Sequence, residues 1–173
     1  KFKPPTPLND EDGVVTASMA IGGNTIPNNS PNNEPASMGE TVKKRLEKIK
    51  PWENAWTADL PPELQINVKT AKLSQIYRRL HPDKPSYTIT GSGGGGTHGY
   101  HYKDARPLTN RERAKLQTFP NNYKFEGNFP SVRKQIGMAV PPQLAKVIFE
   151  AVLKSFVGIE YPWVYPNLEP KSI

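Results

Sequence analysis

A run of glycines is the first feature of the sequence whose composition suggests contact with a ligand. Residues 91–96 read Gly-Ser-Gly-Gly-Gly-Gly and fit the spacing of the G-x-G-x-x-G dinucleotide-binding pattern. That pattern needs a helix directly after it, whereas residues 100–102 indicate a β-strand, so we do not expect a nucleotide fold. Consecutive glycines let the backbone approach a phosphate or a base edge closely, and the same run also fits a flexible hairpin tip.

The residues that usually hold metals or carry catalysis are too few to form a site. The chain has no cysteine and three histidines, which excludes thiolate nucleophiles and thiolate metal ligands. His98, His101 and Asp104 lie close together in the sequence, but structural zinc sites usually need four nitrogen or sulfur ligands. No serine has the surroundings of a nucleophile elbow. We therefore predict neither a metal nor a catalytic residue in this chain.

Basic residues concentrate in the middle of the chain. Residues 69–134 hold 13 Lys or Arg against four Asp or Glu, whereas residues 1–40 hold two basic and five acidic residues. A field of this sign favours a polyanion such as nucleic acid, although a solvated basic surface fits the charge equally well. No apolar run exceeds three residues and the amino end lacks a signal-peptide pattern, so we expect no membrane contact.

Three helices are predicted from start and stop signals. Ser37 with Glu40 has capping-box spacing before a helix that ends at Pro51, and Thr109 with Glu112 repeats this spacing before a helix that Pro120 ends. A last helix starts near residues 141–142, continues to about residue 156 and stops at Gly158. Its wide apolar stripe, which needs a partner surface, consists of Leu144, Val147, Ile148, Ala151, Val152 and Phe156.

The remaining segments read as strands and loops. Residues 87–90 have the β-branched and aromatic composition of a strand, and we expect them to pair with residues 100–102 across the glycine run. The first 36 residues are polar and rich in Pro, Asn and Gly, which predicts irregular or partly disordered structure.

Two stretches resemble motifs of one enzyme family. Residues 106–120, Arg-Pro-Leu-Thr-Asn-Arg-Glu-Arg-Ala-Lys-Leu-Gln-Thr-Phe-Pro, resemble the ninth motif of the DNA cytosine-5 methyltransferases. Residues 135–142, Gln-Ile-Gly-Met-Ala-Val-Pro-Pro, resemble the tenth motif of the same family and follow in the right order. Upstream, Thr88-Ile89 resembles the Thr-aliphatic pair of the family's target-recognition region. The resemblance extends over about residues 52–156.

The resemblance implies an α+β architecture. Residues 1–104 would form a loop-rich DNA-recognition region with short strands, of which residues 1–36 are irregular. Residues 105–157 would form a helical segment that returns to the catalytic domain, and residues 158–173 a carboxy-terminal tail. The last helix would dock on a Rossmann-like catalytic domain in another chain.

The motifs that the family needs for chemistry do not occur in this sequence. The Pro-Cys nucleophile, the Glu-Asn-Val segment, the Phe-x-Gly-x-G motif for S-adenosylmethionine and the Gln-x-Arg-x-Arg motif are all absent. The resemblance therefore implies the small subunit of a two-polypeptide restriction-modification methyltransferase of the bacterial cytoplasm. A larger catalytic chain would supply the cysteine and most of the S-adenosylmethionine site. The assembled enzyme would methylate C5 of a flipped cytosine in duplex DNA, and this chain alone would be inactive.

Roles for individual residues follow from the same resemblance. Side chains before and within the expected strand, together with the glycines, would contact DNA: Gln75, Arg78, Arg79, Thr88, Gly93, Gly94, Gly95 and Gly96. The tenth motif would help to form the cofactor pocket through Gly137, Met138, Ala139 and Val140, although Met138 stands where the family has Asn and lacks the donor and acceptor of an amide. An architectural role would fall to Arg106, Thr109, Arg111 and Glu112.

Two other functions fit the same residues. The chain could be a stand-alone basic DNA- or RNA-binding module without enzymatic activity, or the remnant of an enzyme that has no active partner. Dependence on a second chain distinguishes the subunit from both. A proteolytic or engineered fragment of a longer enzyme would show the same motifs.

Overall fold

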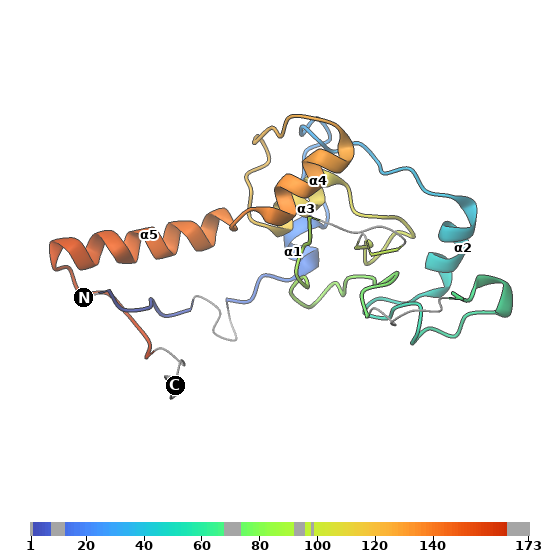
Figure 1. The fold of residues 1–173 in the computed structure, drawn as a ribbon, viewed down its shortest axis with the longest axis horizontal. Helices are drawn as coiled ribbons and strands as arrows, with labels where there is room; N and C mark the ends of the chain where they lie inside the picture. Colours follow the sequence, from blue (N-terminus) through green and yellow to red (C-terminus); the bar gives the residue numbers. More distant parts are fainter. Residues whose placement is uncertain (1, 8–12, 68–73, 92–95, 98, 166–173) are drawn as a thin grey trace, which may run out of the picture. The chain divides into compact units, whose positions relative to one another are not determined.

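The computed structural model describes residues 2–7, 13–67, 74–91, 96–97 and 99–165 of the chain. Its helices are α1 (Ala17–Ile21), α2 (Glu40–Lys48), the 3-10 helix η1 (Pro62–Leu64), α3 (Asn110–Leu116), α4 (Phe129–Met138) and α5 (Pro142–Val157) (Figure 1). The fold divides into two compact units, one formed by residues 15–139 and the other by residues 1–14 with 140–173. The three regions predicted from the sequence stay a prediction.

The unit of residues 15–139 is built from short helices and long loops. Helix α3 packs against both α1 and α4. One apolar cluster joins Ile89 to Ala114 of α3 and to Val132 and Ile136 of α4. A second cluster packs Leu46 and Ile49 at the end of α2 on Tyr77 and Tyr100. A third holds α1 against Leu80 and Leu108. The loops are therefore fixed by three small cores rather than by a sheet.

The predicted hairpin is wrong for the residues that the structure describes. No strand forms over residues 87–90 or 100–102, and only isolated bridges occur, which join Tyr100 to Arg79 and to Pro107 within this unit. The backbone of residues 99–101 already bonds to residues 80, 106 and 108, through Leu80 N to Tyr100 O, His101 N to Arg106 O and Leu108 N to Gly99 O. The β-branched composition of residues 87–90 instead reflects burial of Ile89. The described fold is helical and irregular, not α+β.

The predicted helices are present, with one wrong cap. Helix α3 begins with the expected capping box between Thr109 and Glu112. Helix α5 runs from Pro142 to Val157 and ends at Gly158, whose φ of 71° is left-handed. Helix α2 is capped by Gly39 without a side-chain hydrogen bond, so the Ser37 capping box is wrong.

Two α-helices, and also the 3-10 helix η1, have no counterpart in the predictions. Helix α4 starts at Asn128, whose side chain accepts a hydrogen bond from Ser131 N, and it has proline in its first turn. An N-cap asparagine followed by proline is a recognisable start signal. Helix α1 lies in the stretch predicted to be irregular, and Thr16 caps it by accepting from Met19 N. The irregular interpretation of residues 17–21 is therefore wrong.

The other unit consists of α5 and the two ends of the chain. Residues 2–7 and 161–164 run antiparallel, with Thr6 N donating to Pro162 O at 3.1 Å and Val164 N donating to Pro4 O at 3.0 Å. Tyr161 Oη donates to Lys3 O at 2.7 Å and lies 2.9 Å from Ser155 Oγ of α5. These contacts cover the side of α5 that carries Ala151, which is 3% exposed.

The opposite side of α5 is apolar and exposed. Phe156 is 84% exposed, Phe149 66% and Leu153 64%. The stretch Phe129–Val157 is long and apolar enough to cross a membrane by length and composition alone. It consists of two helices, however, because residues 139–141 are not helical. The 16 residues of α5 are fewer than the roughly 20 that span a bilayer.

Candidate functional site

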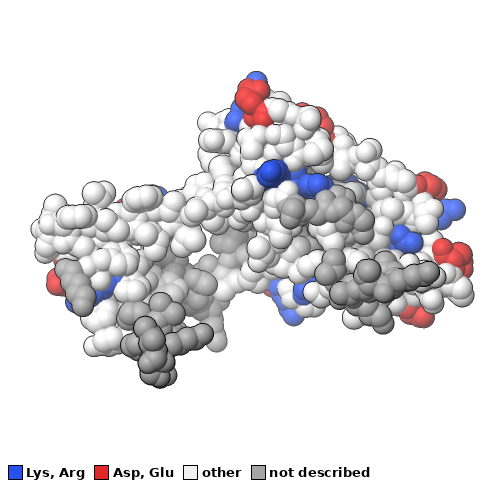
Figure 2. All heavy atoms as spheres, in the orientation of Figure 1, with Lys and Arg blue, Asp and Glu red and all other residues white. Residues whose placement is uncertain are grey.

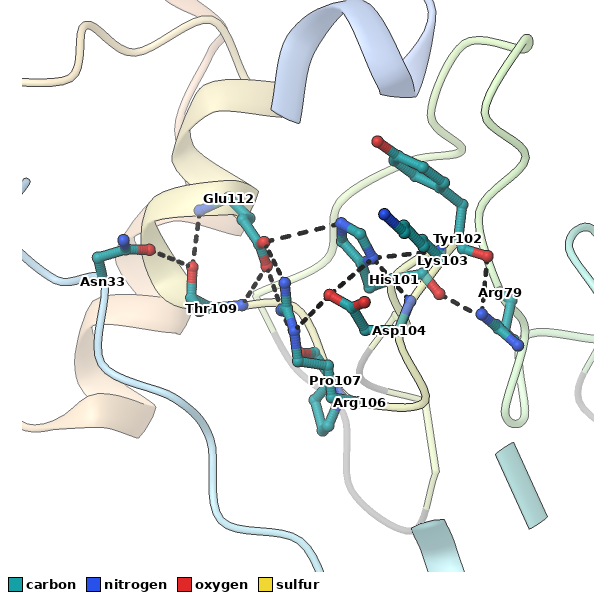
Figure 3. Close-up of polar contacts among 10 residues, drawn as sticks. All are labelled: Asn33, Arg79, His101, Tyr102, Lys103, Asp104, Arg106, Pro107, Thr109 and Glu112. Atoms are coloured by element: carbon teal, nitrogen blue, oxygen red, sulfur yellow. Dashed lines mark hydrogen bonds and ion pairs between the residues drawn. The ribbon is translucent and has the colours of Figure 1, made fainter. Parts of the chain in front are cut away.

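Glu112 is the polar centre of the ninth-motif-like stretch (Figure 3). Its Oε2 accepts hydrogen bonds from Thr109 N and Arg106 Nη1, each at 2.8 Å, and its Oε1 accepts from Arg106 Nη2 at 2.8 Å. In return Thr109 Oγ1 accepts from Glu112 N at 3.0 Å. The bond to Glu112 raises the pKa of Arg106 above its ordinary value. This bidentate pair fixes the start of α3 to the preceding loop.

Arg111 binds three carbonyls of two loops from within the core. Its guanidinium donates to Pro31 O at 2.8 Å, to Pro120 O at 3.0 Å and also to Tyr123 O. The side chain is fully buried, and burial lowers its pKa. All described contacts of Arg106, Thr109, Arg111 and Glu112 are thus made within this chain.

His101 lies beside the same carboxylate. Its Nδ1 accepts hydrogen bonds from Lys103 N at 3.2 Å and from Asp104 N at 3.0 Å, so the neutral ring carries its proton on Nε2. Nε2 faces Glu112 Oε1 at 4.0 Å. Burial, followed by the charge of Arg106, lowers the pKa of His101. The imidazole therefore acts as an acceptor that shapes the loop of residues 101–106.

Arg79 is buried, and its donors are occupied inside the fold. It is 6% exposed, and its guanidinium donates to four backbone carbonyls, those of Leu46, Ile49, His101 and Tyr102. Burial is the main cause of its lowered pKa. These bonds tie α2 to the loop after Tyr100. The predicted contact of Arg79 with DNA stays a prediction.

Arg78 and Gln75 keep unsatisfied polar atoms. The Arg78 guanidinium lies over the rings of Trp52 at 4.4 Å and Tyr87 at 5.3 Å, and its Nε is buried without a hydrogen-bond partner. The Oε1 of Gln75 is also buried without a partner. Their predicted contact with DNA stays a prediction.

The predicted DNA-contacting glycines divide into two groups. Gly93, Gly94 and Gly95 lie outside the described residues. Gly96 is buried and has a φ of 102°; its carbonyl accepts from Tyr77 N at 2.7 Å. A Cβ on Gly96 would lie 2.8 Å from the Tyr77 ring. Gly96 is therefore required for packing on Tyr77, and the expected approach of its backbone to bases stays a prediction.

Gly137 packs backbone against backbone. A Cβ on this residue of α4 would lie 1.9 Å from Gly91 N and 2.2 Å from Thr90 C. A Cβ on Gly91 would in turn lie 2.7 Å from Lys134 O. The tenth-motif-like stretch thus anchors the segment that carries Thr88, whose side chain is exposed. Of the other predicted cofactor residues, Ala139 is half-buried, Met138 is 71% exposed and Val140 64% exposed.

Arg113 is a functional candidate that the sequence does not single out. It follows Glu112 in α3, where a cation would ordinarily face solvent, yet it is buried and lines two cavities, one of them together with Thr88. No group of three His, Cys, Asp or Glu that could hold a metal ion occurs among the described residues. Basic side chains gather on the face of Figure 2 near α3 and α4. The described geometry therefore offers cationic and hydroxyl donors.

Comparison with known proteins gives one consistent result. A family model for C-5 cytosine-specific DNA methylases matches residues 14–154. The chain is 54% identical to the type II methyltransferase M.BbvI of Brevibacillus brevis over 172 residues, which are 99% of this chain and 45% of that protein. It is 41% identical to the type II methyltransferase M.NgoFVII of Neisseria gonorrhoeae over 161 residues, 90% of this chain and 42% of that one. The chain thus spans less than half the length of these two relatives.

A shorter relative and a solved structure are also similar to this chain. The type II methyltransferase M.AquIB of Picosynechococcus sp. is 37% identical over 112 residues, which are 55% of this chain and 75% of that protein. A crystal structure of a prophage-encoded E. coli protein, described as a DNA modification methyltransferase, matches 73% of this chain and 29% of its own at 21% identity and a TM-score of 0.53. The latter likeness concerns the fold alone.

Proposed function

The chain belongs to the C-5 cytosine-specific DNA methylase family, and from that premise we propose that it is the DNA-recognition part of a cytosine-5 methyltransferase whose catalytic part lies elsewhere. The assembled enzyme would transfer a methyl group from S-adenosylmethionine to C5 of a cytosine turned out of duplex DNA. In this division of labour the chain contributes recognition and positioning in the bacterial cytoplasm, and the catalytic part contributes the nucleophile.

One observation carries this proposal. The family model covers most of the chain, yet the chain contains no cysteine. Cytosine C6 must be attacked by a thiolate before C5 can accept a methyl group in this family. The nucleophile must therefore come from the part of the enzyme that corresponds to the rest of its longer relatives.

The catalytic part is proposed to be a separate polypeptide. M.AquIB supports this, because the aligned 112 residues make up three quarters of that protein, which is therefore a short chain. The exposed apolar side of α5 supports it as well, since Phe149, Leu153 and Phe156 leave much apolar surface in water. We propose that this side of α5 docks on the catalytic polypeptide.

The residues proposed for S-adenosylmethionine fit the cofactor only in part. Met138 and Val140 are exposed and could pack on the cofactor's apolar atoms, but neither side chain offers a polar group. Gly137 is enclosed by the backbone of Thr90 and Gly91. When bound, the cofactor supplies the methyl group, and the catalytic polypeptide would supply most of its contacts. What this chain adds at that site is apolar cover from Met138 and Val140.

Recognition of double-stranded DNA is proposed for the segment around Thr88. Thr88 is exposed shortly before the glycine run, and a hydroxyl there suits a backbone phosphate. Arg78 and Gln75 lie nearby in sequence and have buried polar atoms without partners. A bidentate arginine suits guanine, so Arg78 is the residue proposed to read a base.

The experiment is methyl transfer with radiolabelled S-adenosylmethionine on duplex DNA. We expect no incorporation by this chain alone, none by the catalytic polypeptide alone, and activity when the two are mixed. Substitution of the Pro-Cys cysteine by alanine in the catalytic polypeptide is the control and should abolish the activity of the mixture. Incorporation by the isolated chain would refute the proposal. DNA binding without activity in any mixture would instead identify a stand-alone binding module.

A further inference from the structure

A cavity of about 240 Å³ lies against the segment of residues 87–90 and is here called the Arg113 cavity. Its lining includes the polar side chains of Gln75, Thr88, Thr97 and Arg113, and also Tyr87, Ile89 and Gly99. The residues come from separate stretches of the chain that the unit of residues 15–139 brings together. Of these, Thr88 is exposed and lies at the rim, whereas Arg113 is buried.

Arg113 is a buried cation that no carboxylate of the described residues neutralises directly. It is 3% exposed, its Nε has no hydrogen-bond partner, and none of the ion pairs between described residues includes it. Its neighbour Glu112 is occupied by Arg106 and Thr109. Burial and the nearby charge of Arg133 lower the pKa of Arg113 to about 10, so the guanidinium is still protonated at neutral pH. A buried cation of this kind is unfavourable for folding unless an anion binds it.

Gln75 also brings an unsatisfied polar group to the cavity wall. Its Oε1 is buried and makes no hydrogen bond. Because the amide can turn by 180°, Gln75 can present its NH2 group as a donor instead. Thr88 adds a hydroxyl at the rim. A positive charge beside neutral donors matches the needs of a phosphate group.

We propose that the Arg113 cavity binds one phosphodiester group of the DNA backbone, with Arg113 supplying the charge and Thr88 and Gln75 supplying further donors. The proposal rests on the proposed function for the identity of the ligand, and it adds a buried residue to the contact made from the surface. Arg113 is thereby a positioning residue that holds the duplex in place without reading its sequence.

A phosphate fits the cavity better than a base edge does. A base edge presents donors as well as acceptors, so it can be bound by neutral groups and does not require a cation. The positive charge of Arg133 lies near that of Arg113 and repels it. A bound anion would offset both charges, whereas a neutral base edge would not. The two ligands also predict different binding data. Loss of a phosphate contact weakens binding to all sequences and lowers the salt slope by about one, whereas loss of a base contact weakens binding to the cognate site alone.

The test measures DNA affinity and thermal stability of the full chain with Arg113→Met. We expect about tenfold or greater loss of affinity on cognate and unrelated duplexes alike, with a salt slope smaller by about one. The midpoint of thermal unfolding should stay the same or rise, because a buried charge without a counter-ion has been removed. Inorganic phosphate should raise the midpoint of the wild-type chain above that in chloride of equal ionic strength, and this rise should disappear in the variant.

Lys115→Met is the matched control, since it removes the same charge from the same helix outside the cavity. The proposal is overturned if both variants lose affinity equally, if Arg113→Met loses affinity only for the cognate site, if its affinity is unchanged, or if its unfolding midpoint falls by several degrees. If the wild-type chain bound no DNA but showed Arg113-dependent stabilisation by phosphate, the anion site would stand and the proposed DNA recognition would fail.

Discussion

The backbone contact between Gly137 and Gly91 allows one stability prediction to be worked out in detail. In Gly137→Ala the new Cβ would lie 1.9 Å from Gly91 N and 2.4 Å from Gly91 Cα, whereas ordinary contact begins at 3.4 Å. The two backbones would have to separate by about 1.5 Å, the difference between 3.4 and 1.9 Å. Neither atom belongs to a flexible side chain, so a rotamer change cannot relieve the contact.

The separation would disturb the core that both segments share. Ile89 lies two residues before Gly91 and Ile136 directly before Gly137, and both are buried in the same cluster. Overpacking of this kind costs up to about 3 kcal/mol. Alanine is a better helix former than glycine by about 1 kcal/mol, which offsets part of this. We expect the free energy of unfolding to fall by about 2 kcal/mol and the unfolding midpoint by about 4 to 8 °C.

Urea denaturation without cofactor or DNA measures this effect, because any contribution of Gly137 to cofactor binding is then absent. Gly39→Ala is the control, since Gly39 has a φ of −74° and a Cβ added there would meet no atom within 4 Å. Its effect should stay within about 0.5 kcal/mol. An unchanged or increased stability of Gly137→Ala, as helix propensity alone would give, would refute the close contact between α4 and Gly91.

Two further predictions concern the surface of α5 and the buried imidazole. Phe156→Ala should weaken association with the catalytic polypeptide by about 10- to 150-fold, because this side chain is 84% exposed and its full burial contributes about 1.5 to 3 kcal/mol. Ile148→Asp should abolish the complex in size-exclusion chromatography, and unchanged elution of both variants beside a Glu160→Ala control would place the interface elsewhere. His101 has a lowered pKa in the folded chain, where Asp104, Glu112, Arg106 and Arg79 face it. As the pH drops below 6.5, the histidine is therefore protonated in the unfolded chain before it is protonated in the folded chain, and the free energy of unfolding should fall. His101→Asn keeps an acceptor for Lys103 N and Asp104 N, and it should make the free energy of unfolding depend less on pH below 6.5. An unchanged pH dependence in this variant would show that His101 is not the group that causes it.

Local hydrogen-bond patterns are what the sequence by itself determined. The capping box of α3 joins Thr109 to a residue three positions away, and the stop of α5 at Gly158 depends on one left-handed residue. Such signals need no knowledge of distant segments. The stretch over residues 106–120 likewise carried the family resemblance, because motifs are read along the chain. The start of α4 at Asn128 was readable in the same way.

Only the tertiary structure decided which polar groups are occupied by contacts within the fold and which are not. Arg79 reads as a surface cation in the sequence, but carbonyls from residues 46, 49, 101 and 102 occupy its donors. Tyr100 pairs with Arg79 and Pro107 instead of the expected strand. Arg113, by contrast, is buried and its Nε has no hydrogen-bond partner. Contacts between segments tens of residues apart determine the burial of a long side chain and the pairing of a backbone, so neither is encoded in a local pattern.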